Sequence, residues 1–113
     1  MCNVLLGIPA YTQDPVYNAL DKALLAALDI TVVDDPEAFD LVSVDSFAYC
    51  PGAERAHLET ILARMPRGLF GGPVEEMVDS SEIGRRFLGS RTPTRVPAYE
   101  PDEKAFYGMR VYL

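Results

Sequence analysis

Short apolar runs alternate with longer amphipathic stretches along the first two-thirds of the chain. Four runs rich in apolar or β-branched residues predict strands. These runs cover residues 4–8, 30–33, 46–50 and 67–70. Between them, apolar residues recur every three or four positions over residues 15–28 and 53–65, which predicts two helices. The strand–helix–strand order at the start predicts that the first two strands pair in parallel.

The first predicted helix begins at Asp14-Pro15. The Asp14 carboxylate can accept hydrogen bonds from free backbone N–H groups of a first turn, and proline suits the first helical position. Asp29 follows the helix, where a residue that tolerates the left-handed conformation is expected. We expect the apolar stripe of this helix to lie against the sheet. The stripe consists of Val16, Leu20, Leu24, Ala27 and Leu28.

Beyond Pro73 the pattern predicts less regular structure. A helical turn is expected at residues 74–78, and a helix at residues 81–88 capped by Ser80 or Ser81. Three prolines make the next stretch extended and irregular. The alternating tail, residues 105–113, predicts an edge strand or a segment packed on the core.

Together these elements predict an α/β fold. We expect a three-layer Rossmann-like domain with a small, mainly parallel sheet of three or four strands and helices on both faces. A single domain would span residues 1–113, with a core over about residues 3–72 and an irregular C-terminal extension over about residues 73–113.

Composition narrows the function classes. The chain has 113 residues and a formal net charge of −7, so its acidic surface disfavours nucleic acids and anionic membranes. Cys2 and Cys50 are too few for the disulfide framework of a small secreted domain. The N-terminal apolar run is too short for a signal peptide, and no run could span a membrane. We therefore expect a cytoplasmic or nuclear protein.

The carboxyl ends of the predicted parallel strands form the first candidate binding site, because ligands of open α/β sheets bind there. This rim collects Tyr11, Gln13, Asp14, Asp34, Asp35, Tyr49 and Cys50. Asp21 lies two helical turns beyond Asp14, so the two carboxylates could act as acid and base, or could only cap and solvate the helix. The chain has no GxGxxG loop, so we expect no bound cofactor.

Two further groups of residues carry weaker hypotheses. Cys50 precedes the helix that holds His57, the only histidine, but seven residues of separation favour a structural thiol and a surface imidazole over a catalytic dyad or a zinc site. A basic patch could attract an anionic ligand or an acidic partner, or could be ordinary solvated surface. The patch consists of Arg85, Arg86, Arg91 and Arg95.

Several segments resemble the SRR-like (sensitivity-to-red-light-reduced) family, especially its fungal members. The resemblance is carried by residues 12–17, the helix with Asp21, the strand running into Asp34-Asp35-Pro36, Phe47–Pro51 and the tail. The Leu-Gly pair of the family is Leu28-Asp29 here. Compared with the family, the chain starts after the strand and Gly-Ser loop that precede the Asp-Pro strand.

The resemblance implies a non-catalytic regulatory module, since the family is associated with circadian-clock regulation and light signalling. It implies a protein partner or self-association as a homodimer. The alternative is a Rossmann-like domain that binds a small molecule, a nucleotide or an adenosyl cofactor at the rim and could be an enzyme. A third reading is an oligomeric scaffold.

Overall fold

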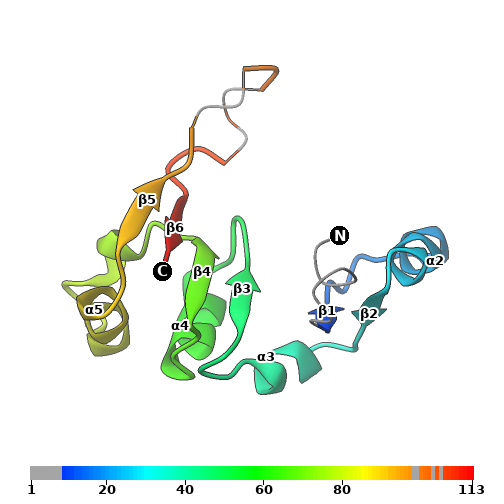
Figure 1. Ribbon diagram of the computed structural model, residues 1–113, viewed down its shortest axis with the longest axis horizontal. Coiled ribbons are helices and arrows are strands. Elements are labelled where there is room, and N and C mark those ends of the chain that lie inside the picture. Colours follow the sequence, from blue (N-terminus) through cyan, green and yellow to red (C-terminus); the bar gives the residue numbers. More distant parts are fainter. Residues whose placement is uncertain (1–8, 98–99, 103, 105) are drawn as a thin grey trace. The chain divides into compact units, whose positions relative to one another are not determined.

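The computed structural model describes residues 9–97, 100–102, 104 and 106–113 (Figure 1). The chain divides into two compact units, Met1–Leu41 and Val42–Leu113. We call them the N-terminal unit and the C-terminal unit. Each has its own sheet, so the fold is mixed α/β with two small sheets in place of one.

The N-terminal unit follows the predicted strand–helix–strand order. Strand β1 (Ala10–Thr12) leads through helix α2 (Ala19–Ala27) to strand β2 (Ile30–Val32), and helix α3 (Glu37–Leu41) closes the unit. Strands β1 and β2 pair in parallel, with Tyr11 opposite Thr31. The direction of this pairing agrees with the prediction, whereas its first strand lies at residues 10–12, later in the chain than the predicted residues 4–8. Tyr11 and Thr12, which we expected to end the first strand, form it. The strand predicted at residues 4–8 lies outside the described residues.

Helix α2 begins four residues later than predicted, at the N-cap Asn18. The Asn18 side chain accepts from the Asp21 backbone N–H at 2.8 Å, and the Asp21 carboxylate accepts from the Asn18 N–H at 3.0 Å. This reciprocal capping box satisfies two backbone donors at once. The predicted cap at Asp14 is therefore wrong: its carboxylate accepts from the Val16 N–H in the turn before the helix. The prediction for Asp29 is confirmed, with a left-handed φ of 61°.

The apolar stripe of α2 does not meet the two-stranded sheet. Leu20 is 78% exposed, and Leu24 and Leu28 are exposed as well. Asp21 and Leu25, one turn apart, are the half-buried pair of this helix. None of the residues described in the N-terminal unit is fully buried, so residues 9–41 form no closed core among themselves.

The C-terminal unit begins with strand β3 (Phe47–Tyr49), helix α4 (Arg55–Ala63) and strand β4 (Gly68–Gly71). These confirm the predicted elements at 46–50, 53–65 and 67–70. A short 3₁₀ helix η1 (Val74–Met77) and helix α5 (Glu82–Gly89) follow, before strands β5 (Pro93–Arg95) and β6 (Arg110–Tyr112). Ser81 caps α5 through its hydroxyl, which accepts from the Gly84 N–H at 3.1 Å.

The four strands of this unit are ordered β3-β4-β6-β5. Strands β3 and β4 are parallel, whereas β4 and β6 and then β6 and β5 are antiparallel. The sheet is thus mixed and not mainly parallel. The tail, expected as an edge strand or as a segment packed on the core, supplies the inner strand β6 and places Tyr112 in the core. Strand β5 takes the edge, where Pro93 can lack a backbone donor without cost.

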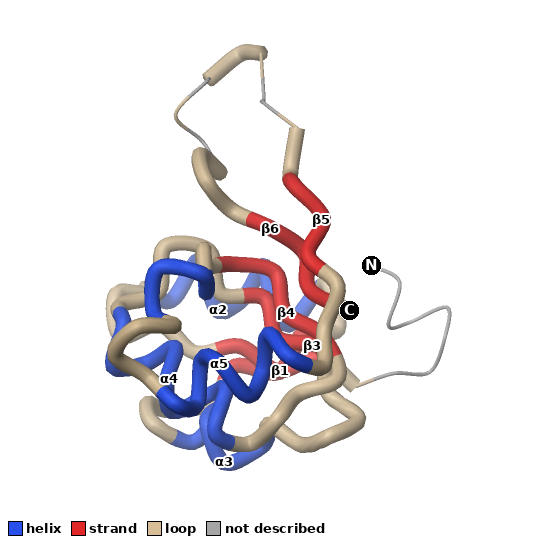
Figure 2. Tube along the Cα trace, turned by 90° about the vertical axis from the view of Figure 1, so that its left-hand side faces the viewer, coloured by secondary structure: helices blue, strands red, loops and turns tan. Residues whose placement is uncertain are grey.

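A single hydrophobic cluster holds the C-terminal unit together. It consists of Leu58, Leu62, Leu69, Val74, Met77, Phe87 and Tyr112. Because α4, η1 and α5 all contribute to this cluster, they lie on one face of the sheet, and Figure 2 shows α4 and α5 on the same side of β3 and β4. The helices of this unit therefore cover one face and not both. The segment after Pro73, expected to be an irregular extension, supplies four of the seven core residues.

Candidate functional site

The carboxyl ends of β1 and β2 bring two of the predicted rim residues together. The Gln13 amide donates to the Asp35 carboxylate at 2.9 Å and accepts from the Ala38 backbone N–H at 2.7 Å. One side chain therefore joins the end of β1 to the turn after β2 and to the start of α3. This contact gives Gln13 and Asp35 a structural role at the rim.

The other rim residues of the N-terminal unit occupy local turns. Asp14 and Asp21 serve the turn before α2 and its capping box, so the two carboxylates are each held by backbone N–H groups. The Asp34 carbonyl accepts from the Glu37 N–H at 2.7 Å. Tyr11 is exposed on β1. Ligand binding by these residues stays a prediction.

Tyr49 and Cys50 belong to the C-terminal unit, so the predicted rim is divided between the two units. The Cys50 N–H donates to the Phe70 carbonyl at 3.0 Å, which continues the β3–β4 pairing past Tyr49. Burial raises the pKa of the Cys50 thiol from its ordinary 9.0 to about 11. Such a thiol is almost entirely protonated at neutral pH, which makes it a poor nucleophile and a poor metal ligand.

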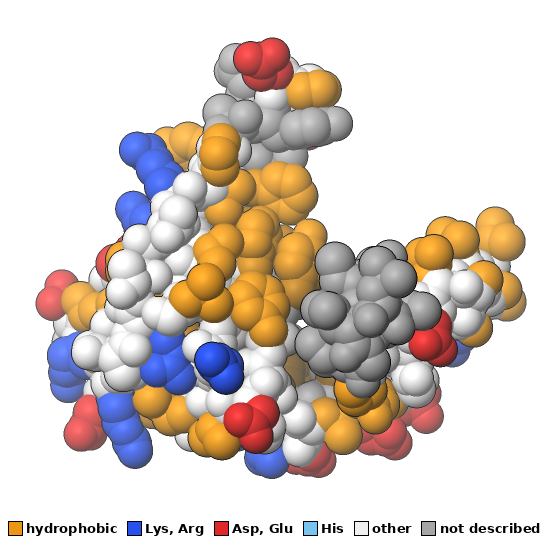
Figure 3. Space-filling model, viewed as in Figure 1, with side chains coloured by type: hydrophobic (Ala, Val, Ile, Leu, Met, Phe, Trp, Pro, Cys, Tyr) orange, Lys and Arg blue, Asp and Glu red, His pale blue; other side chains and the backbone are white. Residues whose placement is uncertain are grey.

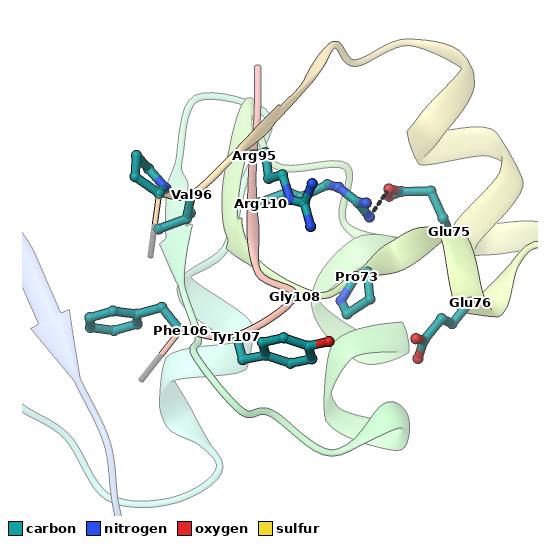
Figure 4. Close-up of a pocket in the computed structure, with 10 residues that line it drawn as sticks. Pro73, Glu75, Glu76, Arg95, Val96, Phe106, Tyr107, Gly108 and Arg110 are labelled. Carbon is teal, nitrogen blue, oxygen red and sulfur yellow. Dashed lines mark hydrogen bonds and ion pairs between the residues drawn. The ribbon is translucent and has the colours of Figure 1, made fainter. Parts of the chain in front are cut away.

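The C-terminal unit carries an open groove of about 670 Å³ beside β5, β6 and η1 (Figure 4). Charged and apolar side chains both line it. The lining residues are Pro73, Glu75, Glu76, Arg95, Val96, Pro97, Phe106, Tyr107, Gly108 and Arg110. In Figure 4, Arg95 and Arg110 lie beside each other above the ring of Tyr107. The volume falls within the range typical of small-molecule sites.

Glu75 lines this groove and accepts hydrogen bonds from two side chains of β6. Its carboxylate accepts from the Arg110 guanidinium at 2.5 Å and from the Tyr112 hydroxyl at 2.5 Å. The Tyr112 oxygen in turn accepts from the buried Val74 N–H at 2.9 Å. Burial first, and then the hydrogen bond to Glu75, raise the pKa of Tyr112 from 10.0 to about 12. The phenol therefore stays a neutral donor throughout the physiological range.

The face of the sheet opposite the helices carries a row of aromatic side chains. Tyr49 stacks on Phe70 with ring centroids 5.0 Å apart, and Phe106 meets Phe70 edge-on at 5.6 Å. Phe47 is 54% exposed and Tyr49 is 64% exposed. We call Phe47, Tyr49, Phe70 and Phe106 the aromatic surface. Figure 3 shows hydrophobic side chains gathered over β3, β4 and β6.

The arginines predicted as a basic patch have separate roles. Arg85 donates to the Val78 carbonyl, and Arg91 donates to the Pro66 carbonyl while its guanidinium lies 5.1 Å from the centre of the Phe87 ring. Arg86 is exposed on α5, and only Arg95 lines the groove. Glu75 and Arg110 had no signal in the sequence, because their meeting depends on β6 lying next to β4.

The described ranges contain neither a candidate metal site nor a candidate membrane-spanning helix. In these ranges no group of three or more His, Cys, Asp or Glu residues is arranged to hold a metal ion. Over the same part of the chain, none of the helices has the length and apolar character needed to cross a membrane.

The comparisons with known proteins agree with the resemblance seen in the sequence. A family model described as the SRR1 domain matches residues 2–113. No curated protein and no solved structure matches the chain. Since the family match covers both compact units, the chain belongs to the SRR1 domain family.

Proposed function

We propose that this chain is a non-catalytic regulatory module of the cytoplasm or nucleus that acts by binding proteins through its aromatic surface. The observation that carries the proposal is the exposure of Phe47 and Tyr49 on a sheet face that no helix described in the C-terminal unit covers. Large aromatic side chains gathered on one face are typical of interaction surfaces, because they release much ordered water at little cost in conformational entropy.

The edge position of β3 adds to this proposal. Strand β3 has one neighbour, β4, so the backbone groups on its other side have no partner strand within the C-terminal sheet. The opposite edge, β5, is blunted by Pro93 and Arg95, whereas β3 contains neither proline nor charge. A partner that presents an extended apolar segment can pair with β3 and cover Phe47 and Tyr49 together. A second copy of the chain is one such partner.

The chemistry of the candidate catalytic groups gives the enzymatic alternative less support. The raised pKa of Cys50 disfavours a thiolate, and Gln13 and Asp35 are already bonded to each other. A nucleotide or adenosyl cofactor that bound the folded rim would raise the melting temperature in proportion to its concentration. A clear rise of this kind would favour the cofactor-binding alternative.

The variant Phe47→Thr/Tyr49→Thr tests the interaction proposal, because threonine removes the rings and keeps strand propensity. The matched control is Leu20→Gln/Leu24→Gln, which removes exposed apolar side chains from α2 and keeps helix propensity. Proximity labelling in cells should lose a defined set of proteins with the first variant and retain it with the second. Sedimentation velocity of the same proteins tests pairing of two copies. The proposal would be contradicted if both variants labelled the same set of proteins and if sedimentation gave both the same molecular mass.

A further inference from the structure

We propose that the groove beside β5 and β6 binds a small organic acid, with one carboxylate held between Arg95 and Arg110 and an aromatic or aliphatic body against the apolar walls. This site is separate from the rim predicted from the sequence. Its two arginines come from adjacent strands of the C-terminal sheet.

Arg95 and Arg110 are direct cross-strand partners in the antiparallel β5–β6 pair. Thr92 and Leu113 exchange both backbone hydrogen bonds, so the alternation along the ladder puts Arg95 and Arg110 at a position without backbone bonds. At such positions the side chains are closest. Two like charges in this place repel each other, and an anion bound between them would relieve the repulsion.

Glu75 compensates only one of the two arginines. It pairs with Arg110 at 2.5 Å, whereas Arg95 has no ion pair or side-chain hydrogen bond among the described residues. The Arg110 side chain is about one-third exposed and lines the groove. In Figure 4 its guanidinium points toward Glu75, and the guanidinium of Arg95 lies beside it. Two guanidinium groups with free N–H donors can bind one carboxylate in bidentate fashion.

The position of Arg110 is fixed before any ligand arrives. Tyr112, which is 0% exposed, holds Glu75 by one hydrogen bond and is itself held by the Val74 N–H. Because Glu75 cannot swing away without leaving the phenol unpaired, Arg110 keeps its orientation. A preorganised donor loses less conformational entropy on binding.

The walls and the charge balance of the groove select the kind of acid. Val96, Pro97 and the ring of Tyr107 supply apolar surface next to the arginines. Among the described residues, the charged side chains that line the groove are Arg95, Arg110, Glu75 and Glu76. Because Glu75 already pairs with Arg110, a ligand with one negative charge is enough to compensate Arg95, and a polyphosphate would meet the repulsion of both carboxylates.

Heteronuclear NMR of the full chain tests the proposal with 3-phenylpropionate as the probe. Addition of this acid should shift the amide signals of Arg95, Val96, Tyr107 and Arg110 in a saturable way. Its neutral analogue 3-phenylpropionamide should not shift them, because the guanidinium groups bind the charge. Adenosine triphosphate should not shift them either. Shifts from the amide equal to those from the acid, shifts from the triphosphate alone, or no shifts at all would overturn the proposal.

Three variants separate this site from general attraction to positive charge. Arg95→Gln should weaken 3-phenylpropionate binding by about tenfold or more, the loss expected for hydrogen bonds to a charged group. The affinity of Arg95→Lys for 3-phenylpropionate should lie between those of Arg95→Gln and the unchanged chain. Lysine keeps the positive charge but lacks the planar guanidinium that donates two parallel hydrogen bonds. Arg86→Gln, on the exposed face of α5, should bind like the unchanged chain. Equal weakening by Arg86→Gln would overturn the proposal.

The unliganded Arg95→Gln protein offers a second readout. Because it removes one of two opposed charges, it should melt at the same temperature as the unchanged chain or higher at low ionic strength. A clearly lower melting temperature would show that Arg95 stabilises the fold and would overturn the assignment of a ligand-binding role.

Discussion

The hydroxyl of Tyr112 joins the Val74 backbone to the Glu75 carboxylate: it accepts from the Val74 N–H at 2.9 Å and donates to Glu75 at 2.5 Å. Tyr112 lies on β6, 38 residues after Val74. The phenol thus ties the last strand to the first turn of η1 inside the core. Its ring also meets Phe87 edge-on, with centroids 5.9 Å apart.

Replacing this tyrosine by phenylalanine tests how much the two hydrogen bonds of the Tyr112 hydroxyl stabilise the fold. Tyr112→Phe keeps the ring and removes the oxygen, which leaves the Val74 N–H buried without its acceptor. The free energy of unfolding should fall by about 1–3 kcal/mol, the usual cost of an unsatisfied buried polar group. Urea denaturation followed by circular dichroism measures this. Tyr107→Phe is the control, because Tyr107 is 84% exposed, and its effect should stay within about 0.5 kcal/mol. An equal loss of unfolding free energy in Tyr107→Phe and Tyr112→Phe would show that the Tyr112 hydroxyl does not stabilise the fold.

The sequence predicted local structure well and strand pairing poorly. The elements β3, α4, β4 and α5 are found near their predicted positions, because apolar periodicity and capping residues such as Ser81 act over short distances. The parallel pairing of β1 with β2 also follows from a short crossover. The place of β6 between β4 and β5 could not be predicted in this way. Leu69 of β4 pairs with Tyr112 of β6 from far along the chain, and such pairing depends on how the whole core packs.

The same division applies to the candidate sites. Gln13 and Asp35 follow two neighbouring parallel strands, so their meeting at one rim was predictable. The pairing of Arg95 with Arg110 was not predictable, because a shift of one residue in the β5–β6 register would turn one of these side chains to the other face of the sheet. The helix cap was misplaced for a simpler reason: Asp14-Pro15 and Asn18 are both good start signals, and only the latter has an aspartate three residues later.

The capping box of α2 should determine how firmly that helix is formed. Asn18→Ala removes the acceptor of the Asp21 N–H and should destabilise the first turn by about 1 kcal/mol. Asp14→Ala should have a smaller effect on α2, since Asp14 bonds only within the preceding turn. Native-state hydrogen exchange of the α2 amides measures both. Faster exchange in Asp14→Ala than in Asn18→Ala would restore Asp14 as the cap.

Gly72 should be intolerant of any side chain. Its φ is +82°, and an added Cβ would lie 2.6 Å from the Val74 nitrogen and 3.0 Å from the Tyr112 hydroxyl. Gly72→Ala should therefore lower the free energy of unfolding by at least about 1–2 kcal/mol, the cost of the left-handed conformation alone. Gly89→Ala is the matched control, because nothing lies within 4 Å of its added Cβ. Thermal melts should show a clear drop for the first variant and none for the second.

The half-buried thiol of Cys50 should titrate far above the physiological range. Burial favours the neutral form in the folded chain, which raises its pKa from 9.0 to about 11. In a Cys2→Ser background, alkylation by iodoacetamide at about pH 8 should be about one hundredfold slower than for the same chain unfolded in urea, because only the thiolate reacts. The sign follows from burial: unfolding exposes the thiol, lowers its pKa and speeds the reaction, and the difference should vanish once the pH exceeds about 11. A folded-state pKa at or below 9 would contradict this, and it would return Cys50 to the list of candidate nucleophiles.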